Sequence, residues 1–88
     1  MKVRIIESYR DLYIYQALDN GINFVCGDYG VFEIIDIAEI QNGEVLSGDF
    51  ENVGEFNVYQ VSSGNILHIS NEDWGMSLAH ARQRIYAR

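Results

Sequence analysis

The sequence predicts an α+β fold, in which a bent antiparallel β-sheet or partly open barrel, with about 5-7 short strands in meander order, packs against a C-terminal α-helix. Three observations predict it. Short apolar segments are separated by turn-forming residues, with eight glycines and no proline among 88 residues. Several segments alternate polar and apolar side chains, as half-buried strands do. The last segment instead spaces its apolar residues as a helix does. A single domain over residues 1–88 is expected, because a chain this short has material for one core.

The N-terminal part is expected to contribute the first strands. Residues 2–6 form a first or edge strand. Residues 9–18 are assigned to a strand because they contain a β-prone Leu-Tyr-Ile-Tyr run. A helix is the alternative there, since Ser8 and Asp11 form an imperfect capping box. The pair Asn20–Gly21 then favours a type I′ turn that leads into a strand at 22–26.

Two more hairpins are expected. The pair Asn42–Gly43 separates apolar residues 31–40 from 45–47, and the turn formers at 62–65 separate strands at 55–61 and 66–70. Carboxylates recur every three residues within 32–40, which suits a helix. The β-branched residues there favour a strand with a bulge near Ile35–Asp36.

The tail predicts a helix from about Trp74 or Gly75 to Tyr86. Its apolar positions share one face of a helix: Trp74, Leu78, Ala81 and Ile85. Four polar residues are expected to begin it, two as caps and two as partners of the helix dipole: Ser70, Asn71, Glu72 and Asp73. Arginines near the other end complement the negative pole.

Charge is the most unusual feature of the chain. The net charge is −7, and residues 11–81 hold twelve carboxylates with no lysine or arginine. Such a surface repels nucleic acid, so direct binding of DNA or RNA is not expected, and it attracts a basic protein. We therefore predict a non-enzymatic acidic interaction module, such as an inhibitor of a nucleic-acid-binding protein or an immunity-type protein. An ordinary solubilising surface is the plainer explanation. The expected partner-binding residues are Glu33, Asp36, Glu39, Asp49, Glu51 and Glu55.

Two alternative functions start from the aromatic residues. A small molecule is expected to fit a cleft between sheet and helix, lined by Tyr13, Tyr15, Tyr59 and Trp74. The same rings also suit an ordinary core. A homodimer is the other alternative, formed through an uncovered sheet edge or through the Trp74 face of the helix.

Catalytic and metal motifs are absent from the sequence, so neither an enzyme nor a cofactor is expected. Cys26 lacks an adjacent base, and two separate histidines, His68 and His80, do not make a metal site. The loop 48–55 resembles a calcium loop only in part, because Val53 stands where an oxygen ligand is needed. No apolar run is long enough for a membrane span, and no secretion signal is recognisable, so a cytoplasmic location is expected.

Overall fold

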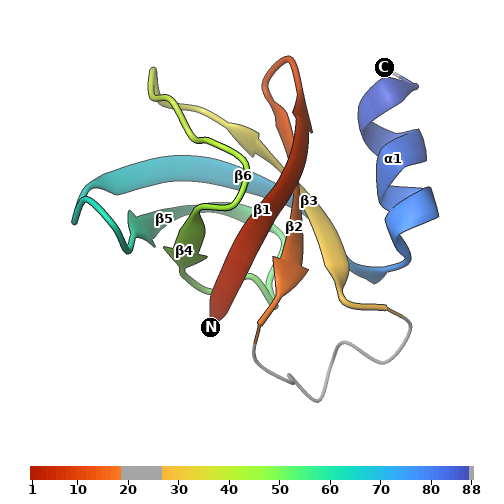
Figure 1. Cartoon of the computed structure of the whole chain (residues 1–88), viewed down its shortest axis with the longest axis horizontal. Coiled ribbons are helices and arrows are strands. Elements are labelled where there is room, and N and C mark those ends of the chain that lie inside the picture. The colour runs from red at the N-terminus through yellow and green to blue at the C-terminus, as the bar shows by residue number, and fades with distance from the viewer. Residues whose placement is uncertain (19–26, 88) are drawn as a thin grey trace.

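The computed structural model describes residues 1–18 and 27–87. In this part of the chain six antiparallel strands close a barrel, and one helix lies against its outer side (Figure 1). The elements are β1 (Lys2–Tyr9), β2 (Leu12–Ala17), β3 (Tyr29–Ile34), β4 (Val45–Ser47), β5 (Gly54–Gln60), β6 (Ile66–Met76) and α1 (Leu78–Tyr86). The described residues form no helix that is long and apolar enough to cross a membrane.

The strand order around the barrel is β1-β2-β3-β6-β5-β4, and β4 pairs with β1 to complete it. The α+β class and the expected number of strands are confirmed, whereas a partly open sheet is wrong because this last pairing closes it. Meander order holds within β1-β2-β3 and within β4-β5-β6. It fails between them, since β3 pairs with β2 and β6 and the chain then crosses to β4.

This crossing explains why the hairpin predicted around Asn42–Gly43 is wrong. Gly43 has a φ of 93°, as a tight turn requires, but the chain has already left the sheet at Ile34. The backbone N–H of Ile35 donates to the carbonyl of His68 (3.0 Å), and the Asp36 carboxylate then accepts from the backbone N–H of His68 (2.7 Å). The N–H of Asp36 also donates to the carbonyl of His68 (3.4 Å), so two consecutive residues bind one carbonyl where the ladder ends. The register shifts lie earlier in β3, between residues 29 and 32.

The other hairpins follow local turn chemistry. The strand predicted from the Leu-Tyr-Ile-Tyr run is confirmed as β2, and it is joined to β1 through Arg10–Asp11, where Arg10 has a φ of 57°. The β5–β6 hairpin is also confirmed, with the N–H of Gln60 donating to the carbonyl of Asn65 (2.8 Å). The predicted turn at residues 20–21 and Cys26 lie outside the described residues.

The helix begins later than predicted. Strand β6 continues to Met76, which pairs with Tyr29, so Trp74 and Gly75 belong to the strand. The N-cap is Ser77, whose hydroxyl accepts from the N–H of His80 at 3.1 Å. Residues 70–73 pair with β3 as part of β6, although their sequence favours a helix start. Their assignment to a helix start is therefore wrong.

Because β2 and β3 are buried on both faces, apolar side chains form two clusters, one on each face. The barrel interior holds Val3, Ile5, Tyr13, Tyr15, Phe32, Ile40, Leu46, Phe50, Val58, Leu67 and Ile69. The outer cluster lies under α1 and holds Leu12, Ile14, Val31, Met76, Ala81 and Ile85. The helix therefore covers one outer side of the barrel and leaves the β5–β6 side uncovered (Figure 1).

A polar network crosses the barrel interior. The hydroxyl of Tyr15 donates to Oδ1 of Asn71 (2.9 Å), whose Nδ2 donates to the carbonyls of Phe50 (3.1 Å) and Asn52 (2.8 Å). Burial of the hydroxyl is the main reason why the pKa of Tyr15 is raised. Gly30 lies opposite Tyr15, and a Cβ there would come within 2.3 Å of the tyrosine hydroxyl.

Ion pairs hold the helix to the barrel. Arg82 pairs with Glu7 of β1 (3.1 Å), and Arg84 pairs with Asp73 of β6 (3.1 Å). The hydroxyl of Tyr86 also donates to Glu7, and together with Arg82 it lowers the pKa of that carboxyl. Asp73 thus partners the last turns of the helix, and not its first turn. Two of the six cations are neutralised on this side of the molecule.

Candidate functional site

Three of the six predicted partner-binding carboxylates lie together on the outside of the barrel. In the sheet, Ser70 of β6 pairs with Glu33 of β3 on one side and with Glu55 of β5 on the other. Directly paired residues point to the same face. That face is the outer one, because Glu33 also pairs with Leu12, a member of the cluster under the helix.

His68 contacts several polar side chains of this surface. Its Nε2 lies 2.9 Å from Glu55 Oε1, its Nδ1 lies 2.9 Å from Asn57 Oδ1, and its backbone N–H is bound by Asp36. We call this surface the His68 face, and it consists of Glu33, Asp36, Glu55, Asn57, His68 and Ser70. It joins segments more than 30 residues apart in the sequence.

The other three predicted carboxylates lie elsewhere. The negative charge of Glu39, with that of Asp11 and Glu44, adds to burial in raising the pKa of Tyr13, so Glu39 lies near that hydroxyl. Asp49 and Glu51 flank the buried Phe50 in the loop between β4 and β5. Asp49 accepts a hydrogen bond from the side chain of Asn52 (2.6 Å).

Exposed apolar side chains border the His68 face. Tyr59 and Ile66 pair with each other one row beyond Asn57 and His68 on the same hairpin, and they are 47% and 66% exposed. Ile37, just after Asp36, is fully exposed. Apolar side chains beside carboxylates are typical of a surface that binds another protein.

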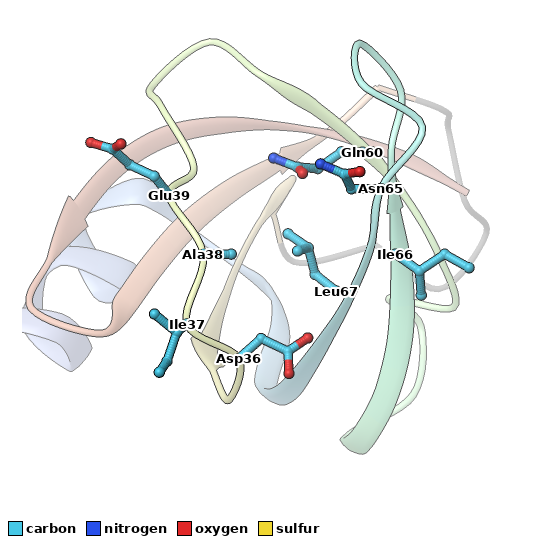
Figure 2. Close-up of a pocket in the computed structure, with 8 residues that line it drawn as sticks. All are labelled: Asp36, Ile37, Ala38, Glu39, Gln60, Asn65, Ile66 and Leu67. Carbon is cyan, nitrogen blue, oxygen red and sulfur yellow. The ribbon is translucent and has the colours of Figure 1, made fainter.

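An open groove of about 500 Å³ adjoins this surface. Its lining residues come from segment 36–39 and from the β5–β6 hairpin: Asp36, Ile37, Ala38, Glu39, Gln60, Asn65, Ile66 and Leu67. Figure 2 shows Asp36 at one end of the groove and the carboxamides of Gln60 and Asn65 at the other, with Ala38 and Leu67 between them. The carboxylate of Glu39 points away on the outer side of the same wall.

The aromatic residues predicted to line a ligand cleft do not lie around one space. Tyr13 and Tyr15 are buried in the barrel, and Trp74 packs partly buried against the same interior cluster. Tyr59 is exposed on the outer face of the hairpin. The contact between sheet and helix is filled instead by Ala81 and Ile85.

Two side chains orient the imidazole ring of His68. Both ring nitrogens are held, one by Glu55 and one by Asn57, and the ring is oriented by these contacts. Among the described residues no group of three or more histidine, cysteine, aspartate or glutamate side chains is placed to hold a metal ion. His80 is exposed on α1 and is not part of this face.

The sequence reasoning missed His68 as the centre of the site, as well as its apolar neighbours. The position of His68 beside Glu55 can be deduced from the hairpin alone. Once the turn at 62–65 sets the register, alternate residues 55, 57 and 59 must face 70, 68 and 66. The approach of Glu33 and Asp36 left no such local signal, because it depends on the pairing of β3 with β6.

No protein-family model matches this chain, and neither a curated protein nor a solved structure does.

Proposed function

We propose that this protein is a non-enzymatic, acidic interaction module that binds a basic protein through the His68 face. One observation carries the proposal: Asp36 and Glu55 both contact His68, and Glu33 lies across Ser70 from Glu55, beside exposed apolar side chains. Carboxylates attract the cations of the partner over about 10 Å at moderate salt, and the apolar residues supply area that is desolvated on contact.

The charge distribution supports a basic partner. Residues 11–81 carry no cation, and Arg82 and Arg84 are already paired with carboxylates at the helix. The segments that form the His68 face contain no lysine or arginine of their own. An inhibitor or immunity-type protein that covers a cationic site is the biological form that fits this chemistry best.

The alternatives have less support. A small-molecule cleft lined by Tyr13, Tyr15, Tyr59 and Trp74 is not favoured, since these side chains lie in separate places. A homodimer through the His68 face brings like charges together, which costs free energy. Each alternative predicts its own result: binding of an uncharged ligand in the first case, and a doubled mass in solution in the second.

A pair of charge reversals tests the proposal. Glu55→Lys changes the centre of the His68 face, whereas Asp28→Lys makes the same change in net charge at an exposed residue that precedes β3. Asp28 lies five residues before Glu33, about 16 Å away along an extended chain. The wild-type protein, used as bait in an extract of its host, is expected to retain a cationic protein whose binding weakens steeply with salt.

The dissociation constant of that captured protein is then measured for each variant. Glu55→Lys should weaken binding about tenfold, a loss of about 1.4 kcal/mol, and Asp28→Lys should leave it within about twofold. Equal weakening by both reversals, or retention that does not depend on salt, would count against the proposal.

A further inference from the structure

Strand β6 extends beyond its neighbour β3 at the open groove. The two strands pair as far as Ile34 and Ile69, and residues 66–68 of β6 then face segment 35–39 across the groove. At His68 this edge is already occupied, because its carbonyl accepts from Ile35 (3.0 Å) and its N–H donates to Asp36. The unpaired part of this edge of β6 therefore lies before His68, at residues 66–67.

Ile66 presents the open part of this edge. In an antiparallel ladder, residues two apart direct their N–H and C=O groups to the same side. His68 directs its groups toward segment 35–36, so Ile66 directs its own groups into the groove. Within the described residues, neither backbone group of Ile66 has a backbone partner across the groove. A free strand edge of this kind is a template for pairing with another chain.

We infer that an extended peptide segment bearing lysine or arginine binds in this groove as an added strand beside Ile66. The inference rests on the proposed function, and it specifies how the basic partner engages. Binding of a strand to a sheet edge uses main-chain hydrogen bonds for affinity and alternate side chains for specificity. The groove offers both kinds of contact.

The walls of the groove define the peptide's pattern. Alternate side chains of the added strand point inward, where Ala38 and Leu67 form an apolar floor (Figure 2). The remaining side chains point outward, toward the exposed Ile37 and the carboxylate of Asp36. A segment that alternates apolar and basic residues satisfies both sides.

Charge selects a basic peptide over a second copy of this chain. Two copies would each bring a net charge of −7 to the contact. Repulsion between like charges makes self-pairing at this edge unfavourable, whereas a cationic strand is attracted.

The test uses a capped peptide of alternating valine and lysine, titrated at low salt into the ¹⁵N-labelled protein. Amide signals of Ile66, His68 and residues 36–39 are expected to shift in a saturable way. Two analogues are compared with it, one N-methylated at the valines and one at the lysines. At least one of them should bind about tenfold more weakly, because N-methylation removes the donors that face β6. Equal binding of all three peptides, or shifts confined to other residues, overturns the inference.

A variant of Ile66 provides an independent check. Ile66→Pro removes an N–H that faces the groove and donates no hydrogen bond to β5, and proline is tolerated as the first residue of a strand. It should weaken the peptide at least fivefold, while Ile66→Thr, which keeps the N–H, should not. If the captured basic protein still depends on Glu55 but the peptide does not bind, the proposed function stands and only the strand mode is excluded.

Discussion

Phe50→Ala is expected to lower the free energy of unfolding by about 3–5 kcal/mol. The ring is fully buried, and its centroid lies 4.7 Å from that of Tyr15, 5.8 Å from that of Phe56 and 6.1 Å from that of Phe32. Truncation leaves a cavity that these rings cannot fill without moving. Urea denaturation followed by circular dichroism measures the loss.

The control is a residue in the same loop. Val53 is 62% exposed, so Val53→Ala should change the free energy of unfolding by less than about 0.5 kcal/mol. A similar small change for Phe50→Ala would mean that this ring does not belong to the barrel core.

Asn71→Leu is expected to cost about 2–4 kcal/mol of stability. Asn71 is 2% exposed, and its carboxamide is bonded to the hydroxyl of Tyr15 and to the carbonyls of Phe50 and Asn52. Leucine keeps the size of the side chain but removes the partner of two buried groups, the Tyr15 hydroxyl and the Phe50 carbonyl, and of the partly buried Asn52 carbonyl. Each unsatisfied group carries a desolvation penalty.

A double-mutant cycle with Tyr15→Phe separates this effect from packing. The two residues share a hydrogen bond, so the double variant should lose less stability than the sum of the two single losses, by at least about 0.5 kcal/mol. Strict additivity, measured by the same urea denaturation, would show that the hydroxyl of Tyr15 and the carboxamide of Asn71 do not interact.

The sequence predicts those parts of the fold that depend on neighbouring residues. The turn formers at 62–65 identify the β5–β6 hairpin, and the apolar spacing of Leu78, Ala81 and Ile85 identifies the helix. Closure of the barrel depends on the pairing of β1 with β4, more than forty residues apart, and no local pattern encodes it. The predicted start of the helix is too early, because a serine at position 70 satisfies the preference for an N-cap as well as the serine at position 77 that caps the helix. Only the pairing of β6 with β3 selects Ser77.

Part of the candidate site also follows from local sequence, and part depends on contacts between distant strands. Glu55 lies on the confirmed hairpin, and its place beside His68 follows from the register of that hairpin. Glu33 comes beside Ser70, and Asp36 reaches His68, only because β3 lies next to β6 in the barrel. Asp49 and Glu51 belong to the loop that places Phe50 in the core, a role that their charges do not reveal.

The fold places the carboxylates of residues 11–81 on different sides of the barrel. Asp73 is paired with an arginine of α1, and so is Glu7, which precedes these residues. Glu55 of the His68 face is instead paired with His68, on the β5–β6 side of the barrel that the helix leaves uncovered (Figure 1). Because these groups are separate, an experiment can determine which part of the surface binds a partner.

The most direct test is an amide NMR spectrum of the ¹⁵N-labelled protein with and without the captured basic protein. The proposed function predicts that signals of Glu33, Asp36, Glu55, Ile66 and His68 shift or broaden first, while those of α1 change least. Changes concentrated on α1 and on the first residues of β1, with the His68 face unaffected, would contradict it.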